Sequence, residues 1–447
     1  MPECTLLQLT PAMQNLASSA TLSMNEAVKA RKAAGRKTIH LGFGEASFPL
    51  HPLLKEALSR AATHTGYGPL QGIPTLRKAI ANYLERTRQI AAAPEYVAVA
   101  PGSKPLLYAL MQILDGDVLL PIPSWVSYAP QARLAGKQVF GVESDPADAH
   151  TLTRERLSNT LAQARQQGAS PRILVVNTPS NPTGGMFSSQ DAEAIAMWCK
   201  AEGITLICDE IYAELAHGWR EHVSPARFYP EGSIVTGGLS KAFSAGGWRL
   251  GYASLPITDD GKRLMTALRA MASEIWSSAT TPVQEAATVA YTYPPELERY
   301  VRRSATIHGY ATNRLYEKLV DLRIDCPQPA GAFYLYPDFS PLRTKLQKRG
   351  ITTSEELAHH LLEEWDIATL PGVAFGDRPD ALRLRLATSM LYVPEDVESE
   401  EEKDVVLWEL LEQADRLPGN GKDEGVGLKL PELERVRERF EGFVKSF

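Results

Sequence analysis

The feature of this sequence that most constrains its fold is a series of short apolar runs, each followed directly by a turn of polar and small residues. Residues 172–176, 204–208 and 233–236 are such runs, and their β-branched side chains are typical of buried strands. Ligands of open parallel sheets bind where the strands end. The turns after these three runs are therefore the first places to look for chemistry.

The turn after the third run, in residues 237–251, holds a lysine among glycines and serines. Lys241 follows Ser240, and Arg249 comes eight positions later. Small residues let backbone and ligand approach closely, and a lysine that loses its water there has a lowered pKa and attacks carbonyls. The serine and the two-pronged arginine suit a phosphate. Pyridoxal phosphate (PLP) asks for both features, although this stretch alone leaves open a surface lysine in an ordinary loop.

Three motifs occur in one order along the chain. Residues 177–184 are NTPSNPTG, residues 209–212 are DEIY, and the Lys241 turn follows them. Together they resemble the fold-type I, class I/II aminotransferases, the family of aspartate, aromatic and kynurenine aminotransferases, with the aspartate/prephenate type nearest. The resemblance covers about residues 19–390.

The resemblance implies a fold and a division into domains. The fold would be α/β, with a mixed, mostly parallel sheet in a large domain and a smaller α+β domain beside it. Residues 1–45 would form an N-terminal arm and part of the small domain, residues 46–299 the large PLP-binding domain, and residues 300–447 the small C-terminal domain. Residues 395–427 depart from the family and are predicted to be an acidic insertion, to which no chemistry is assigned.

The resemblance also implies a role for each polar residue in these turns. Lys241 would hold PLP as a Schiff base and, once freed by the substrate, move a proton in a ping-pong transamination. Asp209 would keep the pyridine nitrogen protonated. Tyr212 and Asn181 would donate hydrogen bonds to the phenolate oxygen of the cofactor, and Trp125 would stack on its ring.

The phosphate of the cofactor would lie at the start of a helix that follows the apolar run 96–100, because free backbone N–H groups and the helix dipole bind anions there. In the family, a tyrosine from a second subunit reaches the same phosphate, so the resemblance implies a homodimer with shared sites. The residues expected at the phosphate are Gly102, Ser103, Lys104, Ser240, Arg249 and, from the partner, Tyr67.

The substrate side is less closely matched. Anchored on the Ala-Thr-Ser ending of the strand, Arg383 is expected to bind the substrate α-carboxylate, with Arg385 as the alternative. Gly44, Trp125 and Asn181 would complete the substrate wall. The loop at Gly44 lacks the proline and aspartate of the family pattern. Residues 19–22 and Lys104 match positions that favour a dicarboxylate partner, aspartate or glutamate/2-oxoglutarate.

Two other function classes remain open at this point. Carbon–sulfur lyases, aminocyclopropane-carboxylate synthases and amino-acid oxidases share the same lysine, aspartate and arginine, so the outcome on the scaffold could differ. Transcription regulators with a PLP-binding domain need a DNA-binding module ahead of it. Here the resemblance begins within about the first 20 residues, which argues against that class.

Composition narrows the function classes less sharply. The chain has 447 residues, 44% of them hydrophobic, enough for two domains with a large core. The net charge of -6 argues against nucleic acid as the main partner. The four cysteines form no C-x-x-C pair, so no metal site is expected. Without an apolar run of membrane length or a basic leader, the expected location is the cytoplasm, with no membrane partner.

Overall fold

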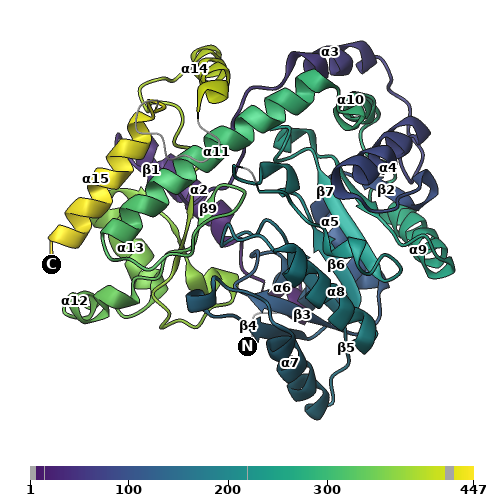
Figure 1. Cartoon of the computed structure of the whole chain (residues 1–447), viewed down its shortest axis with the longest axis horizontal. Coiled ribbons are helices and arrows are strands. Elements are labelled where there is room, and N and C mark those ends of the chain that lie inside the picture. The colour runs from purple at the N-terminus through teal and green to yellow at the C-terminus, as the bar shows by residue number, and fades with distance from the viewer. Residues whose placement is uncertain (1–6, 15, 219, 418–426) are drawn as a thin grey trace.

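A seven-stranded sheet forms the centre of the computed structural model, which describes residues 7–14, 16–218, 220–417 and 427–447 (Figure 1). The strand order is β2-β8-β7-β6-β5-β3-β4. Strand β8 runs antiparallel to both of its neighbours, and the remaining pairs are parallel. The strands are β2 Val97–Ala100, β3 Asp117–Ile122, β4 Val139–Glu143, β5 Pro171–Asn177, β6 Thr205–Asp209, β7 Ser233–Gly238 and β8 Gly251–Ser254. The predicted mixed, mostly parallel sheet is confirmed.

The three apolar runs of the sequence are the neighbouring strands β5, β6 and β7. Their register pairs Asn177 with Asp209 and Asp209 with Thr236, so the polar turns that follow leave the same edge of the sheet. Alternate side chains enter two separate cores, as strand geometry requires. Val175 and Ile207 face one core, and Leu174 and Leu206 face the other. Helices therefore cover both faces.

Helices α5, α6, α7 and α8 each lie between two successive strands of the chain, whereas α3 and α4 precede β2 and α9 and α10 follow β8. Helices α5 and α9 lie over one core, and α7 and α8 over the other, while α3, α4 and α10 pack together at the β2 side (Figure 1). Their bounds are α3 Pro52–Ala61, α4 Pro74–Arg88, α5 Ser103–Ile113, α6 Tyr128–Leu134, α7 Arg154–Gln166, α8 Ser189–Glu202, α9 Asp259–Ile275 and α10 Thr281–Thr292. Within the described residues, none of the helices is long and apolar enough to cross a membrane.

The long helix α11 (Pro295–Asp321) leads from the central sheet to a second region built from both ends of the chain (Figure 1). There β1 (Ile39–His40) pairs with β10 (Ile367–Ala368), and β12 (Leu384–Ala387) lies between β11 (Leu370–Pro371) and β9 (Tyr334–Leu335). The helices of this region are α2 Ala20–Ala33, α12 Arg343–Gln347, α13 Ser354–Trp365 and α15 Pro431–Lys445.

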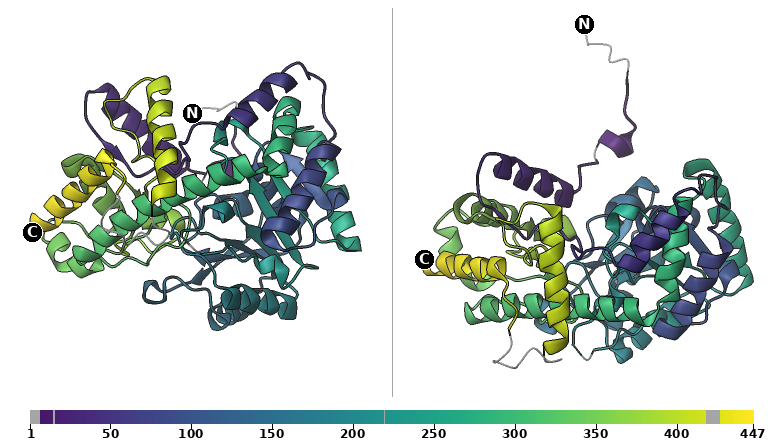
Figure 2. Two further views of the ribbon diagram at one scale, coloured as in Figure 1. Left: turned by 45° about the horizontal axis from the view of Figure 1, so that its top comes forward. Right: turned by 90° about the horizontal axis from the view of Figure 1, so that it is seen from above.

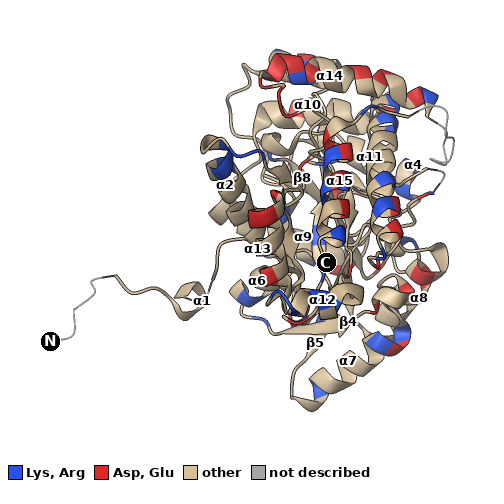
Figure 3. Ribbon diagram, turned by 90° about the vertical axis from the view of Figure 1, so that its left-hand side faces the viewer, with Lys and Arg blue, Asp and Glu red and all other residues tan. Residues whose placement is uncertain are grey.

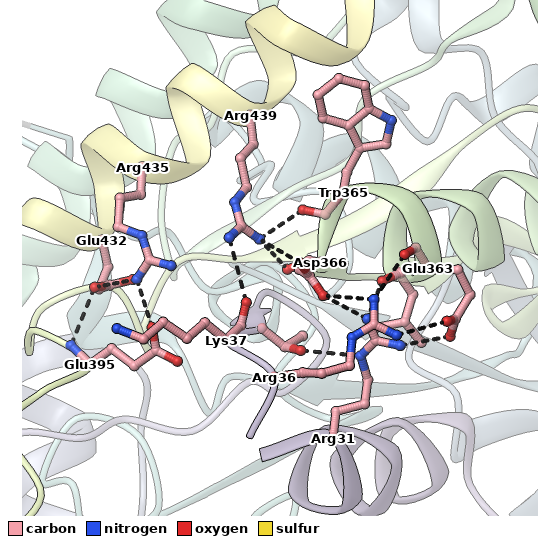
Figure 4. A network of polar contacts seen from close by, with 12 residues as sticks. Arg31, Arg36, Lys37, Glu363, Trp365, Asp366, Glu395, Glu432, Arg435 and Arg439 are labelled. Carbon is pink, nitrogen blue, oxygen red and sulfur yellow. Dashed lines mark hydrogen bonds and ion pairs between the residues drawn. The ribbon is translucent and has the colours of Figure 1, made fainter. Parts of the chain in front are cut away.

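Helix α2 is fastened to this region by ion pairs, and its Ala20 and Met24 pack against the small core around Phe375. All of its side chains are at least partly exposed. Arg31 contacts Glu363 at 2.8 Å and Asp366 at 2.7 Å, and Arg36 pairs with the same two carboxylates (Figure 4). From the other side, Arg439 of α15 donates to the backbone of the same corner. This cluster joins the two ends of the chain.

The chain before α2 stands away from the body of the molecule. The short helix α1 (Pro11–Gln14) lies on this outlying segment (Figures 2 and 3). Its apolar side chains Leu9, Met13 and Leu16 are exposed. The N-terminal arm expected in residues 1–45, which the family resemblance would pack on a partner subunit, stays a prediction.

The predicted acidic insertion contains a well-packed helix. Helix α14 (Glu400–Gln413) is capped by Ser399, and its acidic residues face outward (Figure 3). Leu407, Leu410 and Leu411 are buried, and the helix packs along α11. The sequence predicts a helix at residues 405–411, and the observed helix starts earlier, at Glu400. The glycines at 419 and 421 predict a loop, which lies outside the described residues.

Candidate active site

Lys241 lies at the carboxyl end of the central sheet, in the turn that leaves β7. Its Nζ donates a hydrogen bond to the carbonyl oxygen of Gly44 at 2.6 Å. Burial lowers the pKa of Lys241 to about 8; Glu45 opposes this shift, and Arg385 and Arg249 add to it. A reactive neutral amine is therefore accessible close to neutral pH, as a lysine that attacks carbonyls requires.

Asp209, at the end of β6, is a buried carboxylate held by two hydroxyl donors. Tyr128 donates to its Oδ2 at 2.6 Å, and Thr236 donates to its Oδ1 at 3.2 Å. Burial raises the pKa of Asp209 to about 6, and the two hydrogen bonds limit the rise. An anion held so firmly in an apolar setting is suited to pair with a protonated ring nitrogen.

Tyr212, in the turn after Asp209, lies against Tyr334 of β9. The hydroxyls of Tyr212 and Tyr334 lie 2.8 Å apart. A Cβ at Gly44 would overlap the Tyr334 hydroxyl, so only glycine fits that position. The Lys241 Nζ lies 5.7 Å from the centre of the Tyr212 ring. Gly44, Tyr212 and Lys241 are thus brought together as expected, with Tyr334 as an added member.

The two candidate arginines on β12 and the turn before it lie in different settings. Arg383 is engaged by two carboxylates, Asp338 and Asp377, each at 2.9 Å. Arg385 is 1% exposed, contacts the Gly42 carbonyl at 2.6 Å, and reaches the Asn181 side chain at 3.5 Å. Arg385 therefore lies beside Asn181 and close to Lys241, whereas the structure places the preferred candidate, Arg383, outside this group.

The surroundings of Arg385 suit an anion that is not part of the protein. Its Nε is buried and has no hydrogen-bond partner among the described residues. The rings of Tyr334 and Phe375 flank the guanidinium, with centroids 5.0 and 5.4 Å from Cζ. A cation held between aromatic faces, with an unused donor, offers a bidentate grip to a carboxylate.

A cradle for an anion lies where α5 begins. Gly102 has a φ of 103°, and a Cβ there would lie 2.5 Å from Nη2 of Arg249. A Cβ at Gly251 would overlap the backbone N of Ser103. The two glycines thus let an arginine and the first N–H groups of a helix converge, which is the arrangement that phosphate binding needs. Ser240 lies next to Lys241 on the same side of the sheet edge.

Lys104 and Trp125 form the wall next to this cradle. The Lys104 Nζ lies 4.9 Å from the Trp125 ring centroid, and Trp125 packs edge-on against Tyr128. Burial, and then Arg249, lower the pKa of Lys104. The Trp125 indole therefore packs on the same tyrosine whose hydroxyl donates to Asp209. In this place it can cover a ring that is bound beside Asp209.

Tyr67, like Arg383, is a predicted site residue that a single protomer does not bring to this group within the described chain. Its side chain is 95% exposed. Two residues of the site, Tyr128 and Tyr334, were not predicted from the sequence. Tyr128 ends the Pro-x-Trp-x-x-Tyr stretch at 123–128, and Tyr334 lies in the alternating apolar run 330–336. Both runs predict strands or turns, and neither indicates which hydroxyl reaches the site.

Comparisons with known proteins show which family the chain is similar to. Residues 36–392 match the family model described as aminotransferase class I and II. The chain is 36% identical over 395 residues to an aspartate aminotransferase of Geobacillus stearothermophilus, covering 86% of this chain and 95% of the relative. It is 33% identical over 389 residues to the aspartate/prephenate aminotransferase of Thermus thermophilus, covering 85% and 94%. The solved aspartate aminotransferase from Thermus thermophilus with maleate superposes with a TM-score of 0.77 at 31% identity, covering 92% and 100% of the two chains.

Proposed function

Since this chain belongs to the class I and II aminotransferases, we propose that it moves the amino group of an L-amino acid to a 2-oxo acid with PLP bound at Lys241. One observation carries the proposal. An amine of lowered pKa, a buried carboxylate and an anion cradle meet at the edge of one sheet, supplied by Lys241, Asp209 and the Gly102–Arg249 cradle. The family and the transaminase activity expected from the sequence are confirmed.

The residues of the site fit this cofactor. The cradle at Gly102, Ser103, Lys104, Ser240 and Arg249 would take its phosphate, and Asp209 its ring nitrogen. Trp125 would cover the ring, and Tyr212 and Asn181 would donate to its phenolate oxygen. When bound, PLP supplies an electron sink for the bond broken at the substrate α-carbon.

The chain itself supplies binding and proton transfer. Arg385, in place of Arg383, would bind the substrate α-carboxylate through its free Nε and adjacent Nη. This anchors the α-carbon above the sheet edge, where Lys241 takes its proton as a general base and later returns it. Because Lys241 lies in residues 46–299 and Arg385 in residues 300–447, we propose that the two expected domains meet at this site.

We propose a dicarboxylate as one partner, aspartate or glutamate/2-oxoglutarate. The names of the relatives point this way, and Lys104 places a second cation in the same wall as Trp125. We expect kcat/KM for aspartate to exceed that for leucine by about 100-fold or more, because a site built for a charged group leaves buried polar atoms unpaired with an apolar one. Comparable rates with the two donors would overturn the dicarboxylate assignment.

The test of the function is an absorbance spectrum of the purified, PLP-loaded protein before and after adding one amino acid without any oxo acid. We expect the visible cofactor band to disappear with aspartate or glutamate, and one equivalent of oxo acid to form. A product with a broken carbon–sulfur bond, a ring-closed amino acid, or released ammonia would assign a different PLP reaction. No visible band after loading would remove the role of Lys241.

We also propose a cytoplasmic homodimer in which Tyr67 serves the site of the partner. The measurement is subunit mixing of two inactive variants, Lys241→Ala and Tyr67→Asp. After random mixing, about a quarter of the sites combine an intact Lys241 with an intact Tyr67 from the other chain, so activity should return to that level. If Tyr67 acted within its own protomer, such mixed sites would gain no activity.

The hydroxyl of Tyr334 allows a finer test. We expect Tyr334→Phe to lower kcat about fivefold, the effect of about 1 kcal/mol from one lost hydrogen bond to Tyr212, with KM little changed because the ring under Arg385 remains. Steady-state kinetics with saturating oxo acid measure both. The matched control is Tyr336→Phe, whose hydroxyl bonds Asp377 at 2.5 Å outside the site. An equal loss of kcat in both variants would contradict the role given to Tyr334.

A further inference from the structure

The segment from Asp209 to Glu214 supplies side chains both to the candidate active site and to a buried ion-pair cluster around Arg88. Asp209 and Tyr212 face the site described above. Glu210 and Glu214, from the same six residues, both contact Arg88, which closes helix α4. One guanidinium thus holds the segment on each side of Tyr212.

The Arg88 contact is almost completely dry. The side chain of Arg88 is 4% exposed and that of Glu210 is 0% exposed. Its Nε donates to Oε2 of Glu210 at 3.2 Å, and its Nη2 donates to Oε1 of Glu214, which also accepts from the Tyr83 hydroxyl. Aromatic rings pack edge-on around the cluster; they are Tyr83, Tyr252, Tyr291, Tyr293 and Phe243.

The cluster of Arg88, Glu210 and Glu214 can fix the position of residues 209–214 without taking part in the reaction itself. Burial raises the pKa of Glu210 to about 7, and the attraction of Arg88 opposes the rise. After Asp209 the chain leaves β6; the Glu210 N–H donates to the Thr236 carbonyl at 2.9 Å, and the Glu210 carbonyl accepts from the Ala213 N–H at 3.0 Å. To these backbone bonds Arg88 adds a side-chain contact on each side of Tyr212, to Glu210 and to Glu214.

We propose that Arg88 is a positioning residue, which holds residues 209–214 so that Asp209 and Tyr212 meet the bound cofactor in the correct orientation. The inference rests on the proposed function, because the cofactor is what those two residues would contact. A planar guanidinium reaches both carboxylates at once through fixed donors, whereas a lysine in its place is a single point charge. Loss of the grip would let the segment shift, and a shift of about 1 Å at a reacting group costs about 100-fold in rate.

The test compares Arg88→Lys with Arg31→Lys, a matched control. Arg31 also joins two carboxylates, Glu363 and Asp366, but at the α2 corner far along the chain (Figure 4). Both changes keep the charge and remove a bidentate grip. The measurements are the dissociation constant of PLP from the apoprotein, kcat and KM for the amino donor, and the thermal midpoint.

For Arg88→Lys we expect at least a tenfold weaker PLP affinity and about a 100-fold lower kcat with KM near that of the wild type. For Arg31→Lys we expect the thermal midpoint to fall by a comparable amount, while PLP affinity and kcat stay at their wild-type values. If the two variants lose the same midpoint and PLP affinity and kcat stay at wild-type values in both, the role of Arg88 is only structural and the inference is overturned.

A second variant decides the case if Arg88→Lys does not fold. Glu214→Gln keeps an oxygen for Tyr83 and Arg88 but removes the charge. Weaker PLP binding with an unchanged thermal midpoint supports the positioning role, and unchanged PLP binding overturns it. A wild-type protein that binds no PLP would overturn the proposed function, and this inference with it. A wild type that binds PLP, beside an Arg88→Lys protein that binds it equally well, overturns this inference alone.

Discussion

Replacing Lys241 with alanine is expected to lower kcat by at least about 10⁴-fold, because one side chain supplies both the covalent attachment of the cofactor and the proton transfer at the α-carbon. Among the described residues, the Lys241 Nζ makes one hydrogen bond, to the Gly44 carbonyl, so its loss leaves little of the fold unsupported. PLP should still bind through the phosphate cradle, but borohydride should no longer fix it to the protein. Mass spectrometry after reduction and a transamination assay measure the two effects.

Lys137 provides the control for this variant. Its ammonium also donates to backbone carbonyls, those of Leu114 at 2.6 Å and Gly116 at 2.8 Å, in a turn remote from the site. Lys137→Ala should keep covalent PLP and activity. If Lys241→Ala still carried PLP that borohydride fixes, another amine would be the point of attachment.

The pKa of Lys241 adds a pH dependence to the same experiment. Burial lowers this pKa to about 8, so the neutral amine becomes the major form as pH rises through that value. The rate at which apoprotein captures PLP should therefore rise between pH 7 and about 9 and then level off. An unperturbed lysine would keep rising toward about pH 10. A rate that still increases steeply above pH 9 would contradict the buried setting of Lys241.

Sequence reasoning reached the sheet and its catalytic edge because their signals are local. The apolar runs 172–176, 204–208 and 233–236 predict strands one by one, and a polar turn directly after each strand places Asp209 and Lys241 at one edge. These inferences need only the order of elements in the chain.

What the sequence could not settle depends on side-chain direction and on long-range pairing. Arg383 and Arg385 are two residues apart, so alternation alone gives both the same face, and a family pattern favoured the first. The structure separates them because Asp338 and Asp377 draw Arg383 away. Tyr128 and Tyr334 likewise reach Asp209 and Tyr212 across 81 and 122 positions. No local pattern marks such contacts.

The two arginines give the sharpest remaining prediction, because activity and stability should change in different variants. Arg385→Leu should lower kcat/KM for the amino donor by about 10²- to 10³-fold, the effect of losing a buried, bidentate partner for the substrate carboxylate. Most of this loss should appear in KM. Steady-state kinetics with aspartate over a range of concentrations measure it.

The stability of the same variants should show the opposite ranking. Among the described residues, Arg385 forms no ion pair in the protein, so leucine removes a buried charge that burial already disfavours, and the thermal midpoint should stay or rise. Arg383→Leu instead leaves Asp338 and Asp377 without their cation. Removing one partner of such a pair costs about 3 kcal/mol, so its midpoint should fall.

The combined result distinguishes the two assignments without ambiguity between folding and binding. At temperatures below its thermal midpoint, folded Arg383→Leu should retain a KM for aspartate close to that of the wild type. In the wild type, the Arg383 guanidinium binds two protein carboxylates and not a ligand. If instead Arg383→Leu raised KM and Arg385→Leu did not, Arg383 would be the carboxylate ligand after all. Nε of Arg383 donates to Asp338 and Nη1 to Asp377, so a side-on grip on a substrate carboxylate through Nε and Nη2 would then require the Asp338 contact to open.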